Sequence, residues 1–129
     1  MVSLVCALAI VTAVGLTVFA GSWSVTNTKI DSRGFDLSAT GTKYTSQLAA
    51  SYSIATYDGH DYSGTMNTKA KAYYSGGTLG PDQGTATGSN KPKVTGSTSW
   101  MNAVGAPIAV IAYYGVNGSY PNQSPTVYF

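Results

Sequence analysis

Residues 1–23, MVSLVCALAIVTAVGLTVFAGSW, contain no charged side chain, and the first charge in the chain is Lys29. A helix built from this segment would be apolar on every side, so it would need an apolar environment all round. At about 1.5 Å per residue, a helix from Val2 to Trp23 is roughly 33 Å long, enough to cross the hydrocarbon core of a bilayer. The sequence therefore predicts a hydrophobic N-terminal α-helix over residues 1–21 and a β-sandwich domain over residues 22–129.

Three roles are open to this segment. A secretory signal peptide ends in small residues before its cleavage site, as Val18-Phe19-Ala20 before Gly21 does, but it also has a basic start that this segment lacks. A permanent membrane anchor would have the right length but would lack the flanking Lys or Arg that sets its orientation. In the third role, the helix would sit first in the membrane and then pack against its copies in the core of a fibre.

Small side chains favour the packing of such helices in a fibre. Ala9, Ala13, Thr17 and Ala20 recur at three- and four-residue spacing, so one helix face would let a neighbouring helix approach closely. The β-branched residues of the segment are poor helix formers in water but are tolerated where packing or lipid decides the conformation. The residues expected to form the assembly helix are Val2, Val5, Leu8, Ala9, Val11, Ala13, Leu16, Thr17 and Ala20.

The composition of the whole chain is typical of secreted all-β proteins and fibre subunits. Only 9% of the 129 residues are charged, Glu is absent, and Ser and Thr together number 31. A net charge of +2 from scattered Lys and Arg excludes a nucleic-acid surface. Cys6 is the only cysteine, so the predicted domain has no internal disulfide and relies on its core, on glycans or on oligomerisation.

Alternating apolar and polar residues predict an immunoglobulin-like antiparallel β-sandwich of about seven strands. Turn residues separate strands at 31–34 and 58–61, and residues 75–93, dense in Gly, Pro, Asp and Asn, are expected to form one long loop. The run from Ile108 to Tyr114, IAVIAYY, is short and rich in apolar and β-branched residues, so it is expected to be the central buried strand. The uncharged end, residues 126–129, is expected to pack as the last strand.

The sequence offers little catalytic chemistry. His60 is the only histidine, and although Asp58 and Asp61 flank it, Asp-Gly-His-Asp is a turn composition that would leave a metal mostly solvated. No Glu exists to pair with an Asp as acid and base, and no Gly-rich phosphate loop precedes a helix. We therefore expect no enzyme activity, no catalytic residue, no metal and no cofactor. The ten tyrosines are expected mainly at sheet rims and subunit contacts, and a face that stacks on sugars is the less favoured interpretation.

Two N-glycosylation acceptor sequences lie near the C-terminal end, Asn117-Gly118-Ser119 and Asn122-Gln123-Ser124. Such tripeptides also arise by chance in a chain rich in Asn and Ser. Asn117 and Asn122 are candidate glycan carriers if the chain is exported by a cell that makes this modification.

The opening VSLVCALAIVTAVGLTVFAGSW resembles the mature N-terminus of archaeal type IV pilins, which starts Val-Ser or similarly and lacks the glutamate of bacterial pilins. In that family the helix passes directly into an all-β domain rich in Ser, Thr and Gly. The resemblance implies that residues 2–20 form the core helix of a filament, and that an immunoglobulin-like domain, often glycosylated, forms its outer surface. Pilin precursors carry a short basic leader, whereas this sequence begins at Met1, so the resemblance implies a processed form.

Together these observations predict a structural subunit of an extracellular, cell-surface filament, with helices bundled in the core and β domains outside. Its expected partners are copies of itself in a helical homopolymer, the membrane before assembly, and glycans, with no nucleic acid. The alternative hypothesis is a secreted β-sandwich that binds carbohydrate or another surface, with residues 1–20 removed as a signal peptide.

Overall fold

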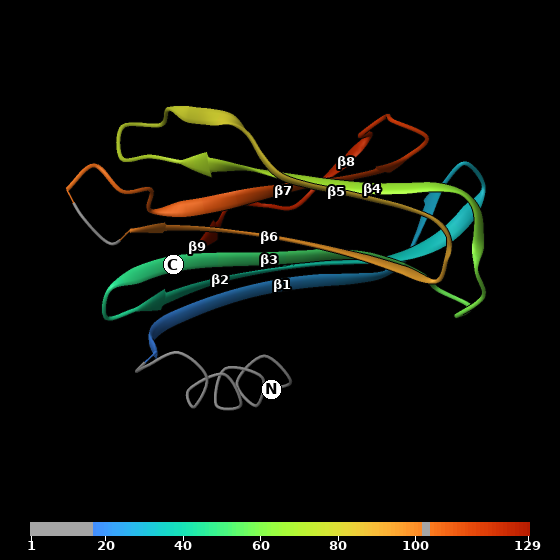
Figure 1. The fold of residues 1–129 in the computed structure, drawn as a ribbon, viewed down its shortest axis with the longest axis horizontal. Coiled ribbons are helices and arrows are strands. Elements are labelled where there is room, and N and C mark those ends of the chain that lie inside the picture. The colour runs from blue at the N-terminus through green and yellow to red at the C-terminus, as the bar shows by residue number, and fades with distance from the viewer. Residues whose placement is uncertain (1–16, 102–103) are drawn as a thin grey trace.

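The computed structural model describes residues 17–101 and 104–129, which form two antiparallel β-sheets packed face to face (Figure 1). These described residues contain no helix. The strands are β1 (Thr17–Ile30), β2 (Arg33–Tyr44), β3 (Gln47–Thr56), β4 (Tyr62–Tyr73), β5 (Leu79–Lys91), β6 (Lys93–Met101), β7 (Ala109–Val116), β8 (Asn122–Gln123) and β9 (Val127–Tyr128).

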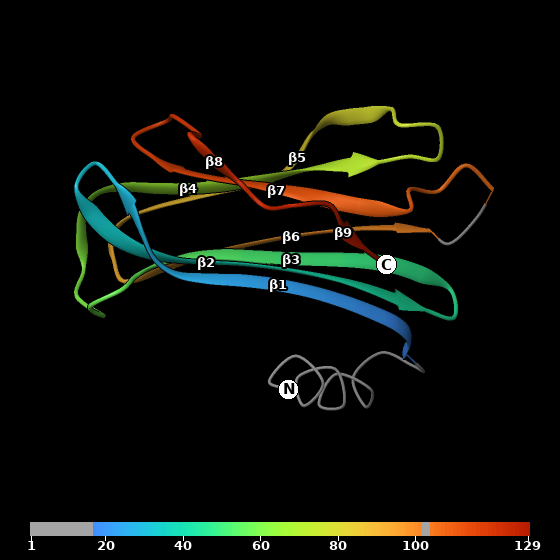
Figure 2. The ribbon, with the colours of Figure 1, turned by 180° about the vertical axis from the view of Figure 1, so that it is seen from behind.

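The first sheet, sheet A, has the strand order β1-β2-β3-β6. The second, sheet B, has the order β5-β4-β7, with the short strands β8 and β9 both paired to β7 (Figure 1, Figure 2). Two-residue turns at 31–32 and 45–46 keep three consecutive strands in sheet A. An immunoglobulin domain instead places its third strand in the opposite sheet. A sandwich is therefore present, but the predicted immunoglobulin-like order is wrong.

The predicted N-terminal helix is wrong where the structure describes it. Residues 17–21 begin β1, in which Thr17 pairs with Tyr44 and Gly21 pairs with Gly41 of β2. Thr17-Val18-Phe19 is β-branched and aromatic, so its helix propensity is low, and β2 supplies a partner for its backbone groups. Residues 1–16, which contain most of the predicted assembly helix, lie outside the described residues.

Strand β5 occupies most of the segment 75–93 that the sequence predicts as a loop. The chain turns between Tyr74 and Thr78, where the Tyr74 backbone nitrogen donates to the Thr78 carbonyl oxygen (2.9 Å), and again at Pro92, between β5 and β6. β5 then pairs with β4 through a register that shifts at three places. An edge strand with such shifts accommodates Gly and Asn. The expectation of a long loop is therefore wrong. The sandwich has seven strands of eight or more residues, close to the number expected, and two further strands of two residues each, β8 and β9.

The core lies between the sheets, on the inward faces of β2, β3, β4 and β7. β7 is buried along almost its whole length, which confirms the predicted buried strand, although its bounds are 109–116 rather than 108–114. Burial of this apolar surface is the main stabilising contribution to the fold. The large apolar side chains with less than 2% exposure are Phe35, Leu37, Ile54, Met66 and Val110, together with the rings of Tyr52 and Tyr114.

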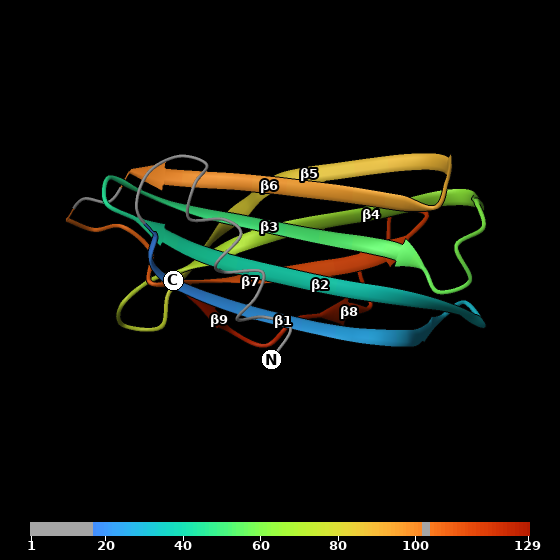
Figure 3. The same ribbon diagram turned by 90° about the horizontal axis from the view of Figure 1, so that it is seen from below.

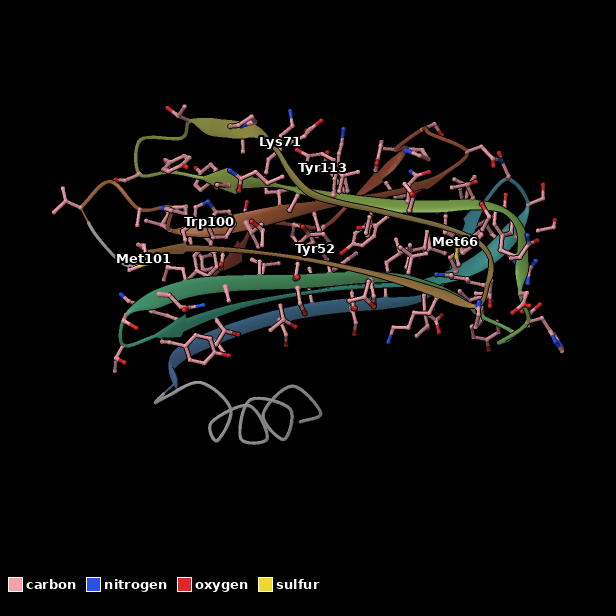
Figure 4. All side chains as sticks on the ribbon, viewed as in Figure 1. Tyr52, Met66, Lys71, Trp100, Met101 and Tyr113 are labelled. Carbon is pink, nitrogen blue, oxygen red and sulfur yellow. The ribbon has the colours of Figure 1, made fainter. Side chains whose placement is uncertain are left out.

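Two buried tyrosines bridge the sheets in opposite directions. Tyr52 of β3 donates a hydrogen bond to the carbonyl oxygen of Gly84 in β5 (2.9 Å), and Figure 4 shows its side chain between the sheets. Tyr114 of β7 donates to the carbonyl oxygen of Ser38 in β2 (2.5 Å). Burial raises the pKa of Tyr52 to about 12 and also raises the pKa of Tyr114. Both hydroxyls therefore stay protonated in the folded domain well above pH 10.

Candidate functional site

Exposed apolar side chains gather at one end of the sandwich, which we call the N-terminal pole because β1 begins there. Figure 1 shows at its left the start of β1, the turn between β4 and β5, and the loop between β6 and β7. Met101 is 73% exposed and Val104 is fully exposed, so their apolar surfaces are free to contact another molecule. Most of the exposed large apolar residues in the described ranges belong to this pole: Leu79, Met101, Val104, Ile108 and Tyr128.

Backbone pairing explains why these residues meet. Tyr73 at the end of β4 pairs with Leu79, and its carbonyl oxygen accepts a hydrogen bond from the Ile108 nitrogen (2.9 Å). The Ile108 carbonyl oxygen accepts in turn from the Phe129 nitrogen (3.1 Å). A cavity of about 360 Å³ lies beside them, with Lys43 as the only charged residue in its described lining. The N-terminal pole is therefore an apolar and uneven surface.

The opposite end of the sandwich, which we call the charged pole, lies at the right of Figure 1. Its turns follow β1, β3 and β5, and these turns with the strand residues beside them carry most of the charges in the chain. Positive and negative side chains balance there, so the pole has no strong field of one sign. Its charged residues are Lys29, Asp31, Arg33, Asp36, Asp58, Asp61, Lys91 and Lys93.

Arg33 organises the turn after β3. One guanidinium nitrogen, Nη2, donates to Asp58 Oδ1 (3.0 Å) and to the His60 carbonyl oxygen (3.1 Å), and Nη1 donates to the Asp61 carbonyl oxygen (3.4 Å). A hydrogen bond from the His60 backbone nitrogen and the nearby guanidinium hold the pKa of Asp58 below its ordinary value. The described residues contain no group of three His, Cys or Asp side chains that could hold a metal. The contacts confirm that Asp58-Gly59-His60-Asp61 is a turn.

The outer face of sheet B carries a smaller group of charges. Lys69 Nζ donates to Asp82 Oδ2 (2.8 Å), and Lys71 Nζ lies 3.7 Å from Asp82 Oδ1. The hydrogen bond from Lys69 lowers the pKa of Asp82. The two amines also lie over aromatic rings. Lys69 Nζ is 4.2 Å from the centroid of the Tyr120 ring, and Lys71 Nζ is 5.9 Å from that of Tyr113. Figure 4 labels Lys71 and Tyr113 on this outer side of the sheet. These charges satisfy one another, so the group needs no ligand to be stable.

The two predicted glycosylation sequences have different surroundings. Asn117 is exposed in the turn after β7, where its Oδ1 accepts a hydrogen bond from the Thr65 nitrogen (3.1 Å). Asn122 is half-buried in β8, and Ser124 of the same sequence is 1% exposed. Ser124 Oγ accepts a hydrogen bond from the Ala112 backbone nitrogen of β7 (2.9 Å), so this hydroxyl is part of the packing of sheet B. On the folded domain, Asn117 is therefore the more accessible acceptor.

Asn67→Ala is expected to destabilise the domain by about 2–3 kcal/mol. Asn67 is 1% exposed, and its side chain donates to the Ser119 carbonyl oxygen (2.8 Å) and accepts from the Gly118 nitrogen (2.9 Å). Truncation leaves both backbone groups without this partner. Urea denaturation measures the loss, and Ser89→Ala, which removes an exposed hydroxyl bonded to Thr65, is the control. Equal losses in the two variants would contradict the expectation.

The predicted assembly residues are only partly described. Thr17 and Ala20 lie in β1 and not in a helix, and the other seven lie outside the described residues. No helix in the described ranges is long and apolar enough to cross a membrane. The sequence did not predict the N-terminal pole, although the uncharged stretch 94–129 contains Met101, Val104 and Ile108 and was an available signal.

Comparisons of the chain with known protein families, with curated proteins and with solved structures found no match.

Proposed function

We propose that the protein is a structural subunit of an extracellular, cell-surface filament. In this arrangement the N-terminal poles face the assembly axis, and the charged poles face solvent. The observation that carries the proposal is that most of the exposed large apolar side chains and most of the charged side chains lie at opposite ends of the sandwich. The apolar end is also the end at which the uncharged residues 1–16 join β1.

The physical drive for assembly would be removal of apolar surface from water. Burial of the N-terminal pole between copies stabilises the assembly by about 25 cal/mol per Å² of apolar area. Before assembly, a membrane would offer the apolar N-terminal segment a similar environment, so the membrane is the expected partner of the unassembled subunit. A glycan on Asn117, after the end of β7, would lie away from the N-terminal pole.

The position of β1 supports retention of residues 1–20. The alternative hypothesis, a secreted binding module, requires cleavage after Ala20. That cut would remove the first four residues of β1 and take away the partners of Thr42, Lys43 and Tyr44 in β2. Loss of paired backbone groups from a strand is unfavourable. A subunit that keeps the whole of β1 is therefore the better-supported proposal.

Val104→Asp is expected to reduce filament assembly at least tenfold while leaving the domain folded, since an unpaired carboxylate buried between copies costs about 3–5 kcal/mol. Val104 is fully exposed in the isolated chain, so the substitution disturbs no core contact. Val11→Asp, which places a charge in the uncharged segment 1–23, is expected to act in the same direction. Electron microscopy and sedimentation of the full chain measure assembly, and circular dichroism checks the fold.

The matched control for these variants is Ser63→Asp. It introduces the same carboxylate at an exposed position next to the charged pole, so filaments should form as in the unmodified protein. Normal filaments from both Val104→Asp and Val11→Asp would overturn the proposal.

A further inference from the structure

The turn after β7 contains Asn117-Gly118, the only Asn-Gly pair in the chain. The turn belongs to the side of the sandwich formed by sheet B, and Figure 3 shows β4 and β7 of that sheet behind sheet A. Asparagine is one of the thermally labile residues. Its side-chain amide can be attacked by the backbone nitrogen of the next residue, and glycine hinders the attack least because it has no Cβ. The sequence therefore favours this reaction most at Asn117.

The reaction converts the side-chain amide into an acid. The Gly118 nitrogen attacks Asn117 Cγ, the new bond closes a succinimide ring, and the bond between Cγ and Nδ2 breaks. Nδ2 leaves as ammonia and takes the proton that the Gly118 nitrogen loses. Water then opens the ring at either of its carbonyl carbons, which leaves aspartate or isoaspartate at position 117.

Asn67 of β4 holds the attacking nitrogen. Its Oδ1 accepts a hydrogen bond from the Gly118 nitrogen (2.9 Å), and its Nδ2 donates to the Ser119 carbonyl oxygen (2.8 Å). Asn67 is 1% exposed, so the packing around it fixes its side chain. To react, the Gly118 nitrogen must lose its proton and turn toward Asn117 Cγ. The hydrogen bond to Asn67 opposes both changes.

The carbon that would be attacked is also held in place. The Asn117 nitrogen donates to the Thr65 carbonyl oxygen (2.7 Å), and Asn117 Oδ1 accepts a hydrogen bond from the Thr65 nitrogen (3.1 Å). Asn117 Cγ is therefore fixed beside Thr65, while the Gly118 nitrogen is directed toward Asn67. The folded turn keeps the two reacting atoms on different partners.

We propose that Asn117 is a site of spontaneous deamidation that the Asn67 side chain keeps unreactive in the folded domain. Reaction requires a local opening of the turn that releases the two hydrogen bonds of Asn67. Isoaspartate brings the Cβ of residue 117 into the main chain, so the lengthened turn no longer fits its partners Thr65 and Asn67. Each such conversion is an irreversible mark of an opening. The reaction does not depend on filament assembly.

The test follows deamidation of Asn117 in the full chain, which is kept in detergent at mildly alkaline pH. Peptide mass spectrometry measures the rate, and enzymatic methylation of isoaspartate identifies the succinimide route. The folded chain is expected to react at least tenfold more slowly than the chain unfolded in urea. Asn67→Ala releases the Gly118 nitrogen, so it is expected to raise the rate in the folded chain roughly tenfold.

The control variant is Ile54→Ala, which separates this local effect from a loss of overall stability. Ile54 is fully buried in β3 of sheet A, away from the turn. Its truncation is expected to cost a similar or larger part of the free energy of unfolding than Asn67→Ala does. Urea denaturation compares the two stabilities. In folded Ile54→Ala, Asn117 should react at close to the rate in the unmodified chain.

Hydrogen exchange of the unmodified chain adds a measurement that needs no variant. The Gly118 amide is expected to exchange more slowly than in the unfolded chain, because it donates to Asn67 Oδ1. Exchange at the rate of the unfolded chain would overturn the proposal. Equal deamidation rates in the folded and unfolded chains, or in Asn67→Ala and Ile54→Ala, would do the same. Formation of aspartate without isoaspartate would also overturn it, because the amide would then be hydrolysed without a succinimide.

Discussion

Gly84→Ala is expected to destabilise the domain by about 3 kcal/mol or more. Gly84 lies in β5 with a φ of +57°, and a Cβ there would overlap Tyr52 Oη and lie 2.6 Å from the Ser97 carbonyl oxygen. Tyr52 cannot move aside, because its ring is buried between the sheets and already lies against the backbone of Gly96. The new methyl group must therefore separate β5 from β6 or break the hydrogen bond from Tyr52 to Gly84.

Gly59→Ala is the matched control for this substitution. Gly59 also has a positive φ, +78°, but a Cβ there would meet no atom within 4 Å. Gly59→Ala should therefore lower the free energy of unfolding only through backbone strain, by about 1–2 kcal/mol. Urea denaturation of both variants gives the two free energies of unfolding. Equal losses of unfolding free energy in Gly84→Ala and Gly59→Ala would contradict the expectation that close packing around Tyr52 makes the substitution at residue 84 the more destabilising one.

Raising the pH from about 9 to about 12 is expected to destabilise the domain by about 3 kcal/mol or more. Above pH 10, the tyrosines of the unfolded chain lose their protons. In the folded domain, burial raises the pKa of Tyr52 to about 12 and also raises the pKa of Tyr114. The unfolded state then binds fewer protons than the folded state, so the free energy of unfolding falls as the pH rises. Below pH 10 both states keep these protons, and the contribution of the two tyrosines is fully present.

Urea denaturation at several pH values measures this alkaline loss, and two variants assign it. Tyr114→Phe removes the hydrogen bond to Ser38, which costs about 1 kcal/mol at neutral pH, but it should also make the alkaline loss smaller. Tyr57→Phe removes a tyrosine hydroxyl from a side chain that is 56% exposed, and it should leave the pH dependence as it is. An unchanged alkaline slope in Tyr114→Phe would contradict the assignment.

Segments with a strong local pattern could be predicted from the sequence. The run from Ile108 to Tyr114 is apolar throughout and became the buried β7, because such a segment is stable only between two layers. The turns predicted at 31–34 and 58–61 contain Gly, Asp and Ser, which tolerate turn conformations, and the structure turns at both places, although the first turn is only Asp31-Ser32. Local chemistry decides these features, so one sequence is enough to find them.

Segments whose conformation depends on a partner strand were predicted wrongly. β5 consists largely of Gly, Thr, Asn and Gln, and only the ladder with β4 makes it a strand. Residues 17–21 are apolar enough for a helix, but pairing with β2 makes them part of β1. In both cases hydrogen bonds between strands outweigh local propensity.

The candidate sites could be anticipated less well than the fold. The lack of charge in residues 94–129 was visible, but the sequence did not reveal that Leu79, from another hairpin, joins Met101 and Val104 at one pole. The rows of Ser, Thr and Ala on the outer face of sheet A were equally hidden, since they combine residues from four strands whose register no local pattern specifies.

The amino-acid sequence by itself determined an uncharged apolar start, a β-rich remainder with few charges and the positions of its main turns, because composition and short-range periodicity express these features directly. Only the tertiary structure decided the strand order, the two poles and the inter-sheet hydrogen bonds of Tyr52 and Tyr114. These features depend on which distant strands lie side by side, and that choice comes from the packing of the whole core.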